Sequence, residues 1–183
     1  MTVASAPRLV MVPHAGRAHA IWVHDVALDP SPAEEARRAA MLSRDERLRA
    51  ERFRFARDRA RFVGGRAALR QILADHGAGS AEHLALVEGA WGKPALARRS
   101  PLRFNVAHSG DRALVAVTRE VEVGIDVERL RPLPDVDAIA RRVCSAAERA
   151  ALCELPAEHR DAAFLRAWVR KESCVKALGV GLH

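Results

Sequence analysis

Three serines that are each followed three positions later by a glutamate constrain the fold of this chain more than any other feature. The pairs are Ser31 with Glu34, Ser43 with Glu46, and Ser145 with Glu148. Such a pair is the signature of a capping box, in which each side chain bonds the other residue's backbone N–H at the start of a helix. The sequence therefore predicts a helix directly after each serine, the first with Pro32 at its first helical position.

Helical and extended blocks alternate around these starts. The Arg-rich stretch 44–76 and the stretch 157–178 are helical in pattern, and Gly77, Gly179 and Gly181 are their stop signals. Strands are predicted for the segments 19–26, 84–88, 102–107, 112–118 and 121–128. The order of strand, helices, strands and helices predicts an α+β fold.

The segment Val123-Gly-Ile-Asp-Val-Glu128 predicts a strand with two carboxylates on one face. Alternate residues of a strand point the same way, so the hydrophobic residues face the core while Gly124, Asp126 and Glu128 face the other side. Adjacent carboxylates need a cation between them, and a hard divalent cation such as Mg²⁺ takes oxygen ligands. Taken alone, the pattern favours a solvated polar strand face over a metal site.

Trp168, Glu172 and Lys176 follow one another at intervals of four in the predicted helix 157–178. Residues four apart share one face of a helix. By itself, a glutamate and lysine with this spacing indicate a surface ion pair of small energy. The tryptophan before the pair and the glycine-rich segment 179–182 after it favour a site that the backbone must approach closely.

Two further motifs offer groups for phosphate. The segment Phe104–Gly110 predicts a strand that ends in a polar turn, where His108 and Ser109 can both contact phosphate oxygens. Gly92-Lys-Pro94 places the cation of Lys93 on a loop stiffened by proline. Alone, the histidine favours a structural role and the loop an ordinary turn. Together, the four motifs supply the groups for a Mg²⁺-assisted reaction at a pyrophosphate.

The order GKP, FNxxHSG, GIDVE, WxxKExxxK and GxGL resembles that of the Sfp-type 4′-phosphopantetheinyl transferases, over roughly residues 44–182. The resemblance implies a pseudo-dimer of two similar α+β halves, with the active site and coenzyme A in the cleft between them. The expected organisation is an irregular lead-in over 1–18, an N-terminal half over 19–118 and a C-terminal half over 119–183.

The resemblance also implies the reaction. Such an enzyme transfers the 4′-phosphopantetheine group of coenzyme A to a serine hydroxyl of an apo acyl or peptidyl carrier protein and releases adenosine 3′,5′-bisphosphate. By resemblance, Asp126, Glu128 and Glu172 ligate Mg²⁺, and Glu172 also helps to deprotonate the carrier serine. Lys176 neutralises charge on the phosphate under attack and on the departing group.

Further residues are expected to bind coenzyme A. His108 and Lys93 hold its phosphates by resemblance, and Ser109 lies beside them in the same turn. Arg49 and Arg57 belong to the basic helical stretch that is similar to the family's site for the adenosine 3′-phosphate.

Two departures from the family pattern leave alternatives open. The family often has serine where this chain has Ala107, and its members usually continue past GxGL through further strands, whereas this sequence ends at His183. The chain is therefore either a short member or an incomplete sequence. The alternative function is a catalytically inactive, truncated relative that only binds coenzyme A or a carrier protein. The pathway served, the tolerance for acyl-coenzyme A and the choice of Mg²⁺ or Mn²⁺ also stay open.

The charge of the chain suits an anionic partner without selecting one. Lys and Arg number 30 against 23 Asp and Glu, a formal charge of +7, which with the resemblance suits an acidic carrier protein. Nucleic-acid binding through the Arg-rich stretch 44–70 ranks last. Stacking aromatics beyond Phe53, Phe55 and Phe62 are lacking there, and so is a known nucleic-acid motif.

Cysteine usage and hydropathy indicate the compartment. Cys144, Cys153 and Cys174 are odd in number and match no CxxC spacing, so a reducing compartment is expected. No signal peptide is evident, and no uncharged stretch is long enough to span a bilayer. We expect a cytoplasmic protein without nucleic-acid or membrane partners, and a monomer, as family members of this size often are.

Overall fold

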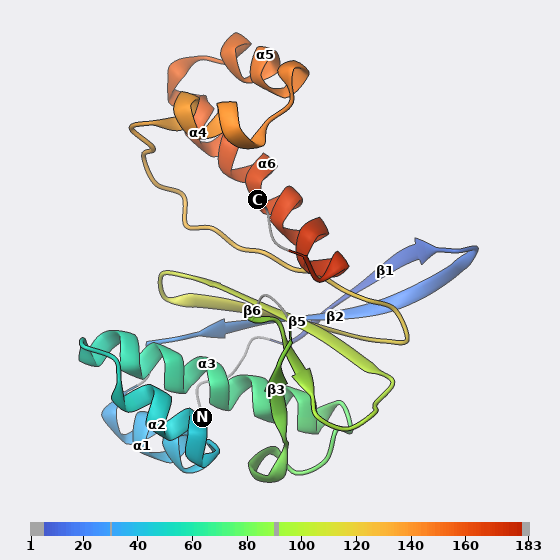
Figure 1. The fold of residues 1–183 in the computed structure, drawn as a ribbon, viewed down its shortest axis with the longest axis vertical. Coiled ribbons are helices and arrows are strands. Elements are labelled where there is room, and N and C mark those ends of the chain that lie inside the picture. Colours follow the sequence, from blue (N-terminus) through green and yellow to red (C-terminus); the bar gives the residue numbers. More distant parts are fainter. Residues whose placement is uncertain (1–5, 30, 90–91, 181–183) are drawn as a thin grey trace.

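The computed structural model describes residues 6–29, 31–89 and 92–180, and it confirms the α+β class (Figure 1). The main sheet is antiparallel with the strand order β1-β2-β6-β5. Its strands are β1 Arg8–His14, β2 Arg17–Ala27, β5 Leu102–Ser109 and β6 Arg112–Arg119. Helix α3 Ala56–Asp75 covers one face, and helices α1 Pro32–Ala40 and α2 Arg44–Glu51 pack against the far side of α3. The short helix η1 Ala81–His83 leads to a small ribbon of β3 Leu86–Glu88 and β4 Pro94–Leu96.

The expectation of an irregular lead-in over residues 1–18 is wrong, because Arg8–His14 forms β1 and pairs with β2. The two strands are joined at Ala15 and Gly16, which have positive φ angles of 50° and 76°. Two-residue hairpin turns require such angles, because their twist then matches that of the strands. β1 is an edge strand of the sheet, and an edge tolerates a proline such as Pro13.

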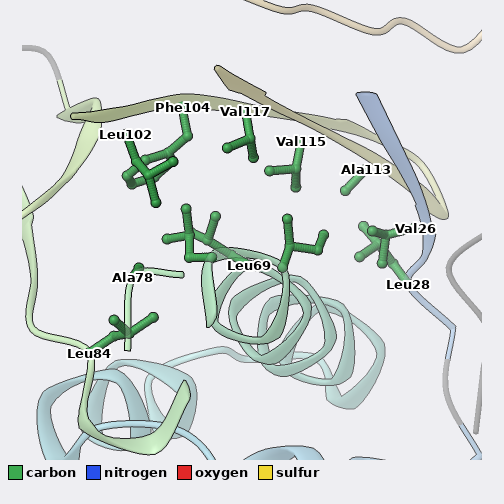
Figure 2. Close-up of a cluster of buried hydrophobic side chains, with 12 residues drawn as sticks. Val26, Leu28, Leu69, Ala78, Leu84, Leu102, Phe104, Ala113, Val115 and Val117 are labelled. Atoms are coloured by element: carbon green, nitrogen blue, oxygen red, sulfur yellow. The ribbon is translucent and has the colours of Figure 1, made fainter. Parts of the chain in front are cut away.

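The main hydrophobic core lies between α3 and the sheet (Figure 2). Leu69 points from α3 toward β5 and β6, where Phe104, Val115 and Val117 form the inner face of the sheet. These four side chains are at most 5% exposed. Full burial of one such side chain stabilises a fold by about 1.5–3 kcal/mol. This core fixes β5, whose outer face and C-terminal end carry polar residues.

After β6 the chain runs as an extended segment before α4 Val136–Val143, α5 Ala146–Glu154 and α6 Ala157–Leu178. The prediction of a strand over 121–128 is wrong, because these residues pair with no strand in the described part of the chain. The side chains of Asn105 and Ser109, which alternate with the inward-facing Phe104, bond this segment instead. Strand side chains stand away from the sheet plane. The segment therefore lies over the outer face of β5, and not at its edge, where a ladder would form.

The helices support the two-half organisation. Helices α1, α2 and α3 have 9, 8 and 20 residues, and α4, α5 and α6 have 8, 9 and 22. All three predicted capping boxes are formed, before α1, α2 and α5. In both halves the arginine that follows the box glutamate donates to the carbonyl of the residue before the box serine at 2.6 Å, from Arg47 to Leu42 and from Arg149 to Cys144. The likeness ends at the sheet, since the described residues after β6 form no strand.

The second set of helices has a core of its own. Leu133, Leu152, Phe164 and Leu165 are buried there, and Trp168 packs against them. Helix α6 ends at Gly179 in a left-handed conformation with φ of 71°, as predicted, while Gly181 and Leu182 lie outside the described residues. Among the described helices, none has the length and apolarity needed to cross a membrane.

Candidate active site

The last turns of α6 lie directly against the backbone of Gly124. A Cβ atom placed on Gly124 would lie closer than 3.0 Å to the carbonyl oxygen of Ser173 and the amide nitrogen of Ala177. A side chain therefore has no room there, and packing alone requires glycine. This contact sets residues 121–129, which we call the carboxylate segment, beside helix α6, which carries Glu172 and Lys176.

Asp126 and Lys176 form an ion pair across this contact. The Lys176 Nζ lies 2.6 Å from Oδ1 of Asp126, whose side chain is only 8% exposed. The second oxygen, Oδ2, is buried and has no hydrogen-bond partner among the described residues. Leaving a buried acceptor unpaired is costly, and a carboxylate oxygen is the kind of ligand that a hard cation takes. Asp126 therefore fits the predicted role of a metal ligand.

Glu128 is held from β5. Its Oε2 accepts a hydrogen bond from the Ser109 hydroxyl at 3.0 Å, and the oxygen of that hydroxyl accepts from the Arg129 amide at 3.0 Å. The Ser109 hydroxyl is thus directed to the carboxylate segment. Its predicted contact with a coenzyme A phosphate stays a prediction.

Glu172 lies one helical turn before Lys176, on the same face of α6. It is half-buried, and its carboxylate forms no hydrogen bond or ion pair with the rest of the described chain. In residues 6–29, 31–89 and 92–180, no three His, Cys, Asp or Glu side chains are close enough to hold a metal ion together. Asp126, Glu128 and Glu172 therefore border one contact without being drawn to a common point.

A cavity of about 490 Å³ lies on the other side of β5, bounded by α2 and α3. Two of the predicted coenzyme A contacts, Arg49 and His108, line it together. The guanidinium groups of Arg49 and Arg66 lie 5.4 and 5.8 Å from the centroid of the Phe62 ring. Burial lowers the pKa of the Arg66 guanidinium from its ordinary value. Cations beside an aromatic ring suit an anionic ligand that also carries a flat ring.

Lys93 and Arg57 do not border this cavity. The Lys93 ammonium donates to the carbonyl oxygen of Lys176 at 2.9 Å and to that of Val123 at 3.3 Å. It therefore joins the end of α6 to the start of the carboxylate segment. The Arg57 side chain is 74% exposed. The structure thus separates these two residues from the Arg49 and His108 pair with which the sequence grouped them.

Sequence reasoning missed Phe62, Arg66 and Asn105. The first two lie four apart on α3, one turn before Leu69, so their helical spacing was a signal for a shared face. Asn105 belongs to the FNxxHSG motif, but its position in the strand did not indicate which group it bonds. It is 3% exposed, and its Oδ1 accepts the Ile125 amide hydrogen at 2.9 Å.

Two family descriptions match consecutive parts of the chain. Residues 27–120 match "4′-phosphopantetheinyl transferase, N-terminal", and residues 122–183 match "4′-phosphopantetheinyl transferase superfamily". The two matches meet where β6 ends and the extended segment begins. The first match contains α1, α2 and α3, and the second contains α4, α5 and α6.

Relatives across bacteria and mammals carry names of the same kind. The 4′-phosphopantetheinyl transferase HetI of Nostoc sp. is 38% identical over 160 residues, which are 86% of this chain and 68% of HetI. The 4′-phosphopantetheinyl transferase psf-1 of Bacillus pumilus is 37% identical over 141 residues, 77% of this chain and 59% of that protein. The human L-aminoadipate-semialdehyde dehydrogenase-phosphopantetheinyl transferase is 32% identical over 164 residues, which are 84% of this chain and 53% of the human protein. The chain thus spans between 53% and 68% of the lengths of these relatives.

Proposed function

Because this chain belongs to the 4′-phosphopantetheinyl transferase superfamily, we propose that it moves the 4′-phosphopantetheine group of coenzyme A to a serine hydroxyl of an apo acyl or peptidyl carrier protein. The second product is adenosine 3′,5′-bisphosphate. The observation that supports this reaction most is the contact of Asp126 with Lys176, with a buried, unpartnered Oδ2 on the carboxylate. The contact joins a carboxylate of one motif to the ammonium of another.

Asp126, Glu128 and Glu172 would hold a Mg²⁺ ion. The ion would neutralise charge on the pyrophosphate of coenzyme A. The unpartnered Oδ2 of Asp126 supports this assignment, since a buried carboxylate oxygen calls for a donor or a cation. Asp126 is paired with Lys176. When an anionic substrate binds, the lysine would be shared between this carboxylate and the phosphate.

The chain's own residues have distinct roles in the transfer. The carrier serine oxygen attacks the phosphorus that bears the pantetheine arm, and the bond from this phosphorus to the bridging pyrophosphate oxygen breaks. The serine proton passes to Glu172, directly or through water, because Glu172 is an unpaired carboxylate beside the site. Lys176 stabilises the negative charge that develops on the departing oxygen.

The cavity lined by Arg49, Phe62, Arg66 and His108 would take the adenosine bisphosphate end of coenzyme A. Its guanidinium groups suit the 3′-phosphate and its aromatic ring suits the purine. Lys93 would reach a phosphate only by releasing one of its bonds, because its ammonium already donates to Glu122 and to the carbonyl oxygens of Val123 and Lys176. The net charge of +7 would steer an acidic carrier protein to the site.

The release of adenosine 3′,5′-bisphosphate tests the proposal. The chain, coenzyme A, an apo carrier protein and Mg²⁺ are incubated, and the nucleotide is quantified by chromatography. We expect release that depends on the carrier protein and stops when EDTA is added. Normal binding of coenzyme A with no release from a folded sample would contradict the transferase and support a relative that only binds.

A further inference from the structure

We propose that Ser109 and Asn105 of β5 are positioning residues that hold residues 125–129 of the carboxylate segment in their reactive geometry. The inference rests on the proposed function, since it concerns the same site. It assigns to β5 a part in the reaction that does not involve touching coenzyme A or the carrier protein.

The carboxylate segment needs such support because no strand pairs with it. Residues 121–128 are extended, yet they belong to neither sheet of the described chain. An extended segment without a ladder has backbone groups that must be satisfied in another way. The amide of Ile125 donates to Oδ1 of Asn105 at 2.9 Å, and the amide of Arg129 donates to Oγ of Ser109 at 3.0 Å.

These two bonds are equivalent in register. Each joins residues that are 20 apart in the sequence. The segment therefore runs parallel to β5, and side chains take the place of the backbone rungs of a ladder. Asp126 and Glu128 lie between the two rungs, so neither can slide along the strand without breaking a bond.

Ser109 does more than hold the backbone. Its hydroxyl hydrogen is donated to Oε2 of Glu128 at 3.0 Å while its oxygen accepts from the Arg129 amide. A hydroxyl has one hydrogen, so this donor is committed to the carboxylate. The bond fixes the rotation of the Glu128 carboxylate. Oε1 is then the oxygen that can bind a cation.

Asn105 is only 3% exposed, so it cannot contact a substrate in this fold. Within the described chain, the side chain of Asn105 bonds only the amide of Ile125, directly before Asp126. A buried asparagine on the outer face of a strand is retained where its amide group is hydrogen-bonded. Its place therefore supports a role through Asp126 and not through coenzyme A.

Binding of Mn²⁺ to the full chain with coenzyme A, followed by electron paramagnetic resonance without carrier protein, tests the role of Ser109. We expect Ser109→Ala to weaken Mn²⁺ binding by about tenfold, as the loss of one charge-assisted hydrogen bond predicts. Ser109→Thr keeps a hydroxyl and is expected to bind as the parent does. The matched control is Ser80→Ala, whose serine makes no side-chain cap bond. Calorimetry with coenzyme A in the absence of metal separates this role from the predicted phosphate contact of Ser109, because the positioning role predicts the same Kd for all three variants.

The outcomes separate this inference from the proposed function. If the parent chain binds no Mn²⁺, the metal part of the proposed function fails, and this inference fails with it. If the parent binds Mn²⁺ and Ser109→Ala binds it equally well, only the positioning role is wrong. Loss of binding in Ser109→Thr to the same degree as in Ser109→Ala would also contradict a role of the hydroxyl.

A second measurement tests Asn105 without the metal. The Ile125 amide is held by Oδ1 of Asn105, so Asn105→Leu, which keeps the size but removes the acceptor, should expose it to hydrogen exchange. We expect exchange at Ile125 to become at least about tenfold faster, while amides of the β5–β6 ladder keep their rates. Unchanged exchange at Ile125 in a folded variant would overturn the role of Asn105.

Discussion

The ammonium of Lys176 lies 2.6 Å from Oδ1 of Asp126, although the two residues are 50 positions apart in the sequence. One belongs to the last turns of α6 and the other to the extended segment that follows β6. Gly124 permits the close approach of helix and segment that makes this contact possible. The GIDVE and WxxKExxxK motifs, which are weak signals when taken separately, are therefore in direct contact in the folded chain.

Replacing Lys176 by alanine should slow transfer by about 100-fold or more, because charge on the departing phosphate is no longer neutralised. The control is Arg141→Ala, which removes an exposed cation from the last turn of α4. We expect the control to keep its rate. Steady-state kinetics and coenzyme A binding together check this, and a raised Kd with an unchanged maximal rate would contradict the role given to Lys176.

Gly124→Ala should destabilise the chain and detach α6 from the carboxylate segment. The added methyl group would overlap backbone atoms of Ser173 and Ala177, which cannot move aside as a side chain can. Overpacking of this kind costs about 1–3 kcal/mol or more. Urea unfolding measures the effect.

The control for this change is Gly65→Ala, inside α3. A Cβ there would meet only Cδ2 of Leu28, at an ordinary 3.6 Å. Alanine favours a helix over glycine by about 1 kcal/mol, so Gly65→Ala should be neutral or stabilising. Equal unfolding free energies for the two alanine variants would refute the packing argument.

Arg49→Ala and Arg66→Ala should each weaken coenzyme A binding by about tenfold, as loss of a charged contact to phosphate predicts. Both residues line the cavity with His108. Arg57→Ala serves as the control, because its side chain is 74% exposed and outside the cavity wall. Isothermal titration calorimetry compares the three. A larger loss for Arg57→Ala than for Arg49→Ala would place the adenosine phosphate elsewhere.

Stability should fall as the pH drops below about 6.5, because of His24 and His76. Their Nε2 atoms lie 2.9 Å apart, and the pair joins β2 to the end of α3. Burial lowers the pKa of both imidazoles from the ordinary value of 6.5. The unfolded chain then binds more protons than the folded one below pH 6.5, so the unfolding free energy decreases by up to about 1.4 kcal/mol per pH unit for each proton.

Urea unfolding at pH 7.5 and pH 5.5 measures this dependence. His76→Asn should flatten it, whereas His83→Asn, at an exposed site in η1, should keep the parent slope. The same slope in the parent and in His76→Asn would show that the pair does not titrate with folding.

Local signals in the sequence marked three helix starts and one helix end, but they did not separate α2 from α3 within 44–76 and did not mark α4. The serine–glutamate pairs that begin α1, α2 and α5 and the glycine that ends α6 act within one turn, so they can be read directly. Strand β1 was missed because its evidence is a two-residue turn at Ala15–Gly16 beside a proline, which resembles a loop.

The candidate site shows the same limit. Alternation put Asp126 and Glu128 on one face of segment 121–128, but it could not show that this segment lacks a ladder, because strand pairing depends on distant residues. The destination of a long side chain is also non-local. Lys93 reaches backbone carbonyls of Val123 and Lys176, which only the fold brings within 3.3 Å.

Intact-mass spectrometry of an apo carrier protein tests the central claim most directly. The carrier is incubated with coenzyme A, Mg²⁺ and either the parent chain or Asp126→Asn, which keeps the size of the side chain but removes its charge. The control variant is Asp137→Asn, in the first turn of α4. We predict a gain of one phosphopantetheine with the parent chain and with Asp137→Asn, and none with EDTA or Asp126→Asn. A gain of the same rate and extent with Asp126→Asn, or no gain with a folded parent chain, would contradict the account.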